Sequence, residues 1–408
     1  MSAAVAVPGN RDVRVISLIG VAHGASHYYQ LAFVTMLLIV RGEVGLSFSE
    51  IGLLGSLFYG VSGLGQTAAG FAVDRFGARP ILAGGLAALG FMLGLISIAH
   101  SFAAFAAIAV LGGLGNCVFH PADFAILNAS VNQKRLGRAF SIHGLGGSLG
   151  WAAGPAMYFL DHMFGWVGAA LIGAVPGLVL AVLVLIHRTD LVDHRIKARA
   201  AASAHAGASV RALFLQAPIL LCLVYFALLA TNTVGIQQFA VPAWKSMFDV
   251  TENYAAICLM VFVIGSATGT LVGGYFADRV HHHERVAAIG LLAAAAFTLP
   301  VAMQTVSAAL LPVILALAGF SGGTTGPSRD MIVRHATPAG ASGKVFGFVY
   351  SGLDLGSFLA PLVFGQLMSL GHPATMFWIA TGLYVLNAGI VTIIRQATAP
   401  SRVTAAAE

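Results

Sequence analysis

Long apolar stretches alternate with short polar turns along the whole chain. Each stretch runs for about 20 residues or more, which is the length that an α-helix needs to cross the hydrocarbon core of a bilayer. Reading the stretches between the charged turns predicts twelve helices, with ends placed to within several residues. Their ranges are 14–40, 49–73, 79–99, 102–131, 136–160, 165–186, 212–240, 253–277, 285–303, 306–333, 342–369 and 373–395. The pattern predicts an all-α polytopic membrane protein.

The predicted helices fall into two halves of six. The longest polar interval, residues 187–211, separates them and is rich in Arg, His, Ala and Ser. We interpret it as a cytoplasmic linker between an N-terminal half (1–186) and a C-terminal half (212–408). The halves repeat, because identical residues, most of them Gly or Pro, recur at offsets of 204 and 206 residues. The pairs are Gly70/Gly274, Asp74/Asp278, Arg75/Arg279, Pro121/Pro327, Gly137/Gly343, Phe140/Phe346, Gly150/Gly356 and Pro155/Pro361. Since the charged loops follow in the same order, we expect a parallel repeat about an axis along the membrane normal.

Composition and charge narrow the class of protein. Hydrophobic residues make up 58% of the 408 residues and charged residues 9%, which excludes an ordinary soluble domain. Of the 21 Lys and Arg, all but Arg41 and Lys245 lie on one predicted side, so we expect that side and both termini to be cytoplasmic. The net charge of +6 is spread over short loops, which argues against nucleic-acid binding. The three cysteines lie in apolar stretches without CxxC spacing and predict neither a disulfide framework nor a thiolate metal site.

The turn after the second predicted helix contains a complete motif, G-x-x-x-D-R-x-G-x-R. With it, the chain resembles the major facilitator superfamily of secondary transporters over nearly its whole length. The resemblance implies alternating access by rocking of the two halves, with this loop as a gate that locks the outward-facing state. An ordinary charged loop is the alternative. The gating residues it implies are Gly70, Asp74, Arg75, Gly77 and Arg79, with a shortened copy at Gly274, Asp278 and Arg279.

A second motif lies on the fifth predicted helix. Gly150, Gly154 and Pro155 form G-x-x-x-G-P, which resembles the family's antiporter motif and is associated with export. The match is partial, because Met157 and Tyr158 follow where the family has further glycines. Small residues four apart also allow tight helix contact without any directional meaning. The stretch NCVFHPADFAIL with the following RLGRAFSIHGLGG is most similar to the fosmidomycin-resistance-type branch of exporters.

Three ionisable residues lie within the apolar fourth and fifth predicted helices. His120 and Asp123 share a face of the fourth predicted helix, and His143 on the fifth lies at the same depth as Asp123. A lone carboxylate in lipid is costly, so we expect His120, Asp123 and His143 to form one polar cluster that takes up and releases a proton. The alternative is that these residues only hydrogen-bond one another and hold the two helices together.

Other polar residues are candidates for a substrate or proton pathway. His23 and His27 share a face of the first predicted helix, and Tyr28 and Gln30 follow them. His23 and His27 could also bind a metal, but no carboxylate shares their span, so we expect no metal and no cofactor. Arg329 can anchor an anion or only pair with Asp330. The further pathway candidates are Asn232, Gln237, Arg329 and Asp354.

These observations favour a secondary active transporter over other classes. The chain has no HExxH motif and no nucleotide-binding loop, so we expect no enzyme and no nucleotide-driven pump. We predict proton-coupled export of a small organic anion or drug-like molecule by a monomer in the inner membrane. The alternatives are uptake or exchange of an organic acid or other metabolite, and a membrane receptor or scaffold without transport. The expected partners are a small-molecule substrate, protons and the lipid bilayer.

Overall fold

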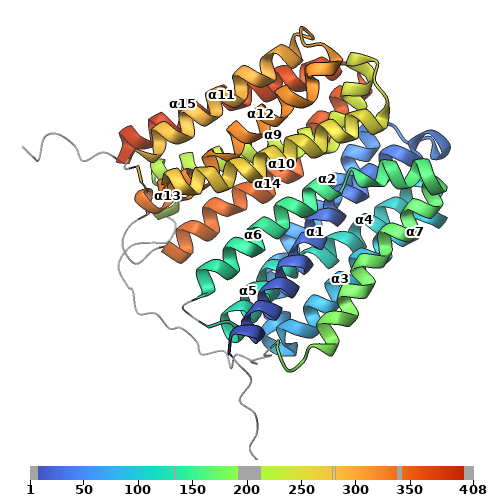
Figure 1. Ribbon diagram of the computed structural model, residues 1–408, viewed down its shortest axis with the longest axis vertical. Helices are drawn as coiled ribbons and strands as arrows, with labels where there is room; N and C mark the ends of the chain where they lie inside the picture. Colours follow the sequence, from blue (N-terminus) through green and yellow to red (C-terminus); the bar gives the residue numbers. More distant parts are fainter. Residues whose placement is uncertain are drawn as a thin grey trace, which may run out of the picture. The chain divides into compact units, whose positions relative to one another are not determined.

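The computed structural model describes residues 8–132, 135–191, 213–277, 279–280, 282–337 and 342–398. All regular elements in these ranges are helices (Figure 1). In chain order they are α1 (Pro8–Val44), α2 (Phe48–Phe76), α3 (Ala78–Leu95), η1 (Ile96–Ile98), α4 (Phe102–Asn116), α5 (Phe119–Ser130), α6 (Leu136–Ala153), α7 (Ala156–Ile186), α9 (Ala217–Phe248), α10 (Glu252–Ala277), α11 (His283–Ala302), η3 (Ala308–Leu310), α12 (Leu311–Gly323), α13 (Thr325–Ala336), α14 (Ser342–Ser369) and α15 (Pro373–Thr398). The all-α fold class is confirmed.

Most predicted spans coincide with one helix or with consecutive helices, whereas the fifth covers α6 and the start of α7 and the sixth covers the rest of α7. Within the described ranges, nine stretches are both long and apolar enough to cross a bilayer. Helices suit this environment because they satisfy every backbone N–H and C=O within the segment. The fifth and sixth predicted spans meet inside α7, where Gly165 has φ 69° and turns the chain between them. Only glycine adopts such a φ without steric cost.

The fourth and tenth predicted spans are each broken in two. The break between α4 and α5 precedes Pro121, and the break between α12 and α13 precedes Pro327. Each proline is the third residue of the new helix, where a backbone N–H would have no partner within the helix. The two breaks lie at the 206-residue offset, so each half has an interrupted helix at the same position.

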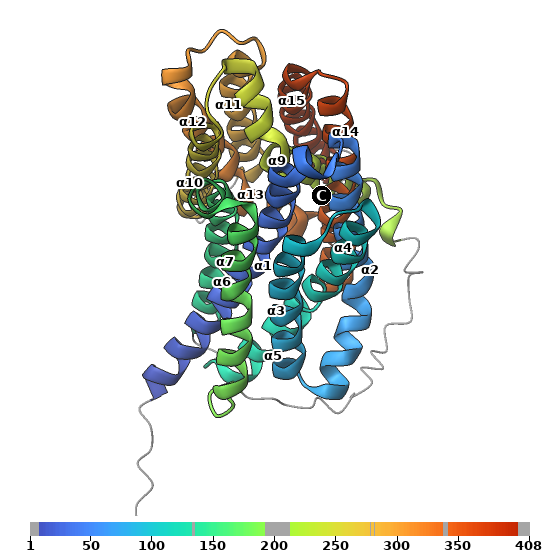
Figure 2. The same ribbon diagram turned by 90° about the vertical axis from the view of Figure 1, so that its right-hand side faces the viewer.

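The chain divides into two compact units, Met1–Ala202 and Ser203–Glu408. In the first, α1 packs on α6, α2 on α4 and α3 on α7 (Figure 1). In the second, the corresponding pairs are α9 with α14, α10 with α12 and α11 with α15 (Figure 2). The repeat seen in the sequence is therefore also a repeat of packing. Most of the predicted linker, residues 192–211, lies outside the described residues.

Glycines allow the first helix of each unit to approach its partner closely. A Cβ atom on Gly150 of α6 would collide with the backbone oxygen of Gly24 on α1. At the equivalent position, a Cβ on Gly356 of α14 would collide with the oxygen of Ala227 on α9. A Cβ on Gly154 would lie 2.6 Å from Leu31 of α1. The G-x-x-x-G pair of the predicted export motif thus forms a helix-packing contact within the first unit.

Candidate functional site

A buried carboxylate lies among α1, α5 and α6 of the first unit. Asp123 of α5 has no exposed surface, and its Oδ2 lies 3.0 Å from Nε2 of His143 on α6. Nδ1 of His23 on α1 approaches the same oxygen at 3.3 Å, without the alignment of a hydrogen bond. One proton lies in this hydrogen bond, and either Nε2 of His143 or Oδ2 of Asp123 carries it, according to the ionisation of the pair. Three different helices therefore supply one ionisable cluster.

Two further histidines extend this cluster. The ring of His23 stacks on that of His143 with centroids 3.5 Å apart. Nε2 of His27 lies 3.2 Å from Nε2 of His23, so one of these two nitrogens donates a proton to the other. The ring of His120 lies 5.5 Å from that of His23 and is exposed. We call His23, His27, His120, Asp123 and His143 the His–Asp cluster.

One oxygen of the buried carboxylate in the His–Asp cluster lacks a partner, which suits a site that takes up a proton. The second carboxylate oxygen of Asp123, Oδ1, is buried and has no hydrogen-bond partner. A buried ionised carboxylate is costly unless it is paired, which here requires a charged histidine beside it. The cluster can therefore exist with a carboxylate–imidazolium pair or with both groups neutral. These two states hold the same number of protons, and one further proton gives the cluster a net positive charge. His120, whose ring lies 5.5 Å from that of His23, is the exposed member of the cluster.

A metal ion is the other species that these residues could hold. One ligand atom from each of His23, Asp123 and His143 lies within 4.8 Å of the others. Ligands of one ion direct their lone pairs at a common point. The rings of His23 and His143 are instead nearly parallel, with an interplanar angle of 20°. This arrangement fits hydrogen bonding to Asp123 better than metal ligation.

Tyr28 and Gln30 of α1 do not join the cluster. The Tyr28 hydroxyl contacts the Met157 sulfur at 3.1 Å and the Gly173 carbonyl at 3.4 Å, both on α7. Gln30 donates to Asn116 of α4 at 3.1 Å, and Asn116 donates to Ser62 of α2 at 2.8 Å. These bonds tie α1 to its neighbours, so the polar residues of this helix divide between the cluster and helix packing.

The second unit has a basic residue where the first has Asp123. Arg329 of α13 corresponds to Asp123 at the 206-residue offset, and both follow the break in their helix. Its Nε donates to Asp330 Oδ1 at 2.9 Å, and its guanidinium carbon lies 4.7 Å from the centre of the Phe226 ring. Tyr350 donates to the same Asp330 oxygen at 3.0 Å. The predicted pairing of Arg329 with Asp330 is present.

The other pathway candidates of the second unit are dispersed. Asn232 is buried and donates to the Ala380 carbonyl at 3.3 Å, a contact between α9 and α15. Gln237 is buried and lines a cavity of about 170 Å³ together with Arg329. Asp354 of α14 is exposed. Of these candidates, Gln237 and Arg329 therefore share a site.

The predicted gating residues lie around the ends of α2 and α10. Gly70 and Asp74 belong to the last turns of α2, Gly77 has φ 97° between α2 and α3, and Arg79 begins α3. Arg75 is exposed and lies over the Phe76 ring at 5.2 Å. In the second copy, Gly274 lies on α10, Arg279 lies over the Tyr275 ring at 3.6 Å, and Asp278 is outside the described residues.

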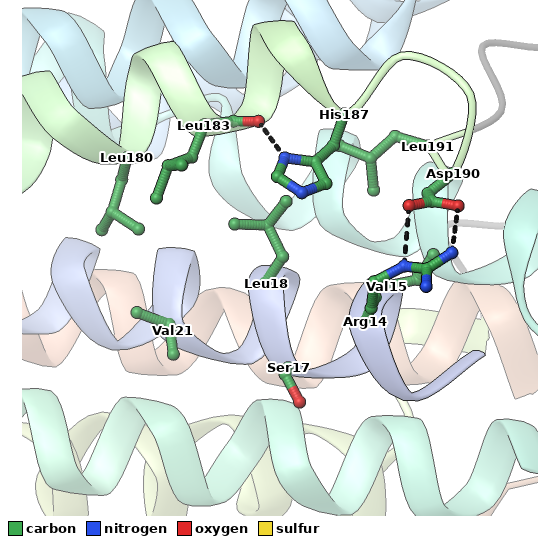
Figure 3. Close-up of a pocket in the computed structure, with 10 residues that line it drawn as sticks. All are labelled: Arg14, Val15, Ser17, Leu18, Val21, Leu180, Leu183, His187, Asp190 and Leu191. Carbon is green, nitrogen blue, oxygen red and sulfur yellow. Dashed lines mark hydrogen bonds and ion pairs between the residues drawn. The ribbon is translucent and has the colours of Figure 1, made fainter. Parts of the chain in front are cut away.

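A larger groove of about 320 Å³ lies between α1 and the end of α7, away from the His–Asp cluster (Figure 3). Its walls are mainly leucine and valine side chains. At one end Arg14 makes two hydrogen bonds of 3.0 Å to the Asp190 carboxylate. These bonds hold the pKa of the Asp190 carboxyl below its usual range. The pair ties the start of α1 to the turn that follows α7.

The sequence prediction missed His23 as a neighbour of Asp123. We expected His23 and His27 on one face of the first predicted helix, and only His120, Asp123 and His143 in one cluster. The face shared by His23 and His27 was visible from their spacing. Gly20 and Gly24 of α1 lie against Gly146 and Gly150 of α6, which allows the two helices to approach closely. This approach is recognisable only when the glycines of both helices are considered together. The polar lining around Gln237 and Arg329 was missed too, because it comes from several helices.

Comparison with known proteins identifies a family. A sequence model of the Major Facilitator Superfamily matches residues 17–241 and 223–408. The fosmidomycin resistance protein of Escherichia coli (strain K12) is 26% identical over 273 residues, which span 65% of each chain. A probable L-galactonate transporter of the same organism is 23% identical over 382 residues, which span 88% of this chain and 83% of the relative.

A solved structure has the same fold. It is a bacterial homologue of the human lysosomal transporter Spinster in an inward-facing and occupied conformation. It matches with a TM-score of 0.73 and 14% identity, over 95% of this chain and 96% of the other.

Proposed function

Because the chain belongs to the Major Facilitator Superfamily, and is therefore a multi-pass membrane transporter of small molecules, we propose that it couples export of a small organic anion or drug-like molecule to proton entry. The His–Asp cluster is the proton site in this proposal. The protein would lie in the inner membrane as a monomer with both termini in the cytoplasm, as the distribution of Lys and Arg suggests.

The observation that supports this coupling most is the contact between Asp123 and His143. A fully buried carboxylate 3.0 Å from a buried imidazole is stable when the pair is formally neutral or zwitterionic, and costly when Asp123 is charged alone. Adding a proton to the zwitterionic pair leaves a positive imidazolium, which changes the interaction of this unit with its surroundings. A transporter can use such a change to favour one conformation over another.

The export direction rests on two weaker observations. Gly150, Gly154 and Pro155 resemble the antiporter motif, although Gly150 also serves close packing between α6 and α1. The second is the similarity to a fosmidomycin resistance protein, since resistance to a compound is commonly achieved by removing it. Proton entry would then drive the substrate outward.

Flux into liposomes tests coupling and direction together. The purified chain is reconstituted, and fosmidomycin and L-galactonate are offered as separate probes with a proton gradient of either sign. A pH-sensitive dye inside the vesicles reports proton movement. We expect at least one probe to move against the direction of proton flow, with protons appearing on the other side. Probe movement that ignores the pH gradient and follows a sodium gradient or a counter-substrate would contradict the proposal.

Uptake or exchange of an organic acid is the second candidate. It is favoured by the similarity to a probable L-galactonate transporter, which spans more of both chains than the similarity to the resistance protein. In the same liposomes, this candidate predicts that L-galactonate and protons move in the same direction. The sign of the proton movement therefore separates the two candidates.

A further inference from the structure

A polar cavity in the second unit is separate from the proton site. It measures about 170 Å³ and lies among α9, α10, α12, α13 and α15. Its polar lining comes from Thr233, Gln237, Ser266, Thr270, Thr325, Arg329 and Tyr384. Drug-sized ligands occupy pockets of roughly 300–1,000 Å³, so this cavity has room for a part of such a molecule. We infer that it is the subsite that binds the carboxylate head of a hydroxylated organic acid.

Arg329 supplies the charge that an anionic head group requires. Its guanidinium lies over the Phe226 ring and uses Nε for Asp330. A guanidinium has five N–H donors in a planar fork, and the bond to Asp330 uses only the one on Nε, so the donors on the terminal nitrogens offer contacts to a carboxylate beside Tyr350. An ionisable residue within a membrane helix is costly and is usually retained for function.

Gln237 gives a second and independent indication of a ligand. Its side chain is 7% exposed and lines the cavity, and its Oε1 has no hydrogen-bond partner. A buried polar atom without a partner costs about 1–3 kcal/mol, which a ligand hydroxyl donating to Oε1 would recover. Thr233 lies one turn earlier on α9 and adds a hydroxyl to the same wall. These groups favour a ligand with hydroxyl groups near its carboxylate.

Two glycines keep the cavity open. Gly322 and Gly326 line it, and a Cβ atom on either would approach no atom closer than 3.7 Å. Neighbouring Gly323 differs, because a Cβ there would collide with the backbone oxygen of Ser266 on α10. Close packing therefore explains Gly323 but not Gly322 or Gly326, where a Cβ atom would fit in ordinary van der Waals contact.

Asp330 competes with a bound carboxylate for the guanidinium of Arg329. Its carboxylate accepts from Arg329 and from Tyr350 on the same oxygen, and its side chain is 41% exposed. A substrate carboxylate must share the guanidinium with Asp330. Removing the charge of Asp330 should therefore tighten anion binding, whereas removing that of Arg329 should weaken it.

The inference names the substrate class of the proposed transporter and so rests on that function, but its test needs no gradient. Binding of gluconate and 3-hydroxybenzoate to the purified full chain is measured by calorimetry, with sorbitol and 3-hydroxybenzyl alcohol as uncharged matches. We expect at least one acid to bind and its uncharged match not to. Loss of a charge-assisted bidentate contact should weaken acid binding about 10- to 100-fold in Arg329→Gln.

Matched variants separate binding from folding. Arg329→Gln/Asp330→Asn keeps the charge balanced and should lose acid binding to the same extent, and Asp330→Asn should tighten it. Gly326→Val should weaken binding by filling the cavity, with an unchanged melting temperature. The inference is overturned if neither acid binds the wild type up to about 10 mM. It is also overturned if an uncharged match binds as tightly as its acid, or if Arg329→Gln and the double variant bind like the wild type. Acid binding without proton-driven flux would leave this inference intact and refute the coupling.

Discussion

Nε2 of His143 lies 3.0 Å from Oδ2 of Asp123, so that a buried hydrogen bond joins α6 to the second part of the interrupted helix α4–α5. The same oxygen faces His23 of α1 at 3.3 Å. One proton-accepting oxygen therefore contacts residues of two other helices. Any change in the protonation of Asp123 alters contacts among α1, α5 and α6 at once, which is what a proton site must do to bias a conformational change.

The glycines of α6 offer a matched pair for stability. Gly150→Ala should lower the melting temperature, because its Cβ has no room against Gly24 and overpacking costs about 1–3 kcal/mol. Gly144→Ala on the same helix should change it little, since its Cβ meets no atom within 4 Å. Thermal unfolding in detergent measures both. Equal melting temperatures for the two variants would contradict the close α1–α6 contact.

The Arg14–Asp190 pair should make stability depend on pH in a defined direction. The pKa of Asp190 is lowered in the folded state by its hydrogen bonds to Arg14. The pair therefore stabilises the fold above the unfolded pKa of about 3.9, and this stabilisation is lost as pH falls through the lower folded value. Asp190→Asn should be slightly less stable than wild type at pH 7, because Arg14 is largely exposed.

The melting temperatures of the wild type and Asp190→Asn, followed from pH 7 to about pH 3, test this sign. The difference between them should shrink as pH falls through about 4. A difference that stays constant or widens over this range would show that Asp190 does not titrate with a lowered pKa in the folded protein.

The fold followed from the sequence because its signals are local. The length of an apolar stretch is visible in one short segment, and the recurrence of Gly150 as Gly356 in the comparison of two such segments. The helix breaks before Pro121 and Pro327 were not predicted, and each of those spans was expected to be one helix. The site followed only in part. Asp123 and His143 were paired correctly from their depth on adjacent helices. The contact of His23 depends on the rotation of α1 about its axis, and the cavity at Arg329 needs several helices to pack together, which no single segment specifies.

The motif that resembles the family's gate predicts an effect of Asp74 on the rate of transport. Asp74→Asn should slow turnover more than it weakens substrate binding, because Asp74 lies near the end of α2, in the motif that resembles the family's gate. Asp249→Asn is the control, since Asp249 is an exposed residue at the end of α9. Calorimetric affinity and liposome flux are measured on the same preparations. A large loss of affinity with normal turnover would assign Asp74 to binding.

The proton site predicts a separation of two transport modes. Asp123→Asn keeps the shape and most hydrogen bonds of the side chain but cannot ionise. It should therefore bind substrate and exchange it across the membrane, while losing transport that is driven by a proton gradient. If the His–Asp cluster only holds helices together, Asp123→Asn should retain gradient-driven transport, and His143→Ala should mainly lower the melting temperature. Glu252→Gln, in an exposed ion pair with Lys245, is the control for an ordinary carboxylate.

The most direct test of the account compares wild type and Asp123→Asn in one liposome assay, with fosmidomycin or L-galactonate as the probe, whichever the wild type moves. Gradient-driven flux and equilibrium exchange of that probe are measured on the same vesicles. The account predicts that Asp123→Asn exchanges the probe within a few-fold of the wild-type rate and shows gradient-driven flux no greater than protein-free vesicles. Gradient-driven flux in Asp123→Asn equal to that of wild type and Glu252→Gln would show that Asp123 is not the proton site.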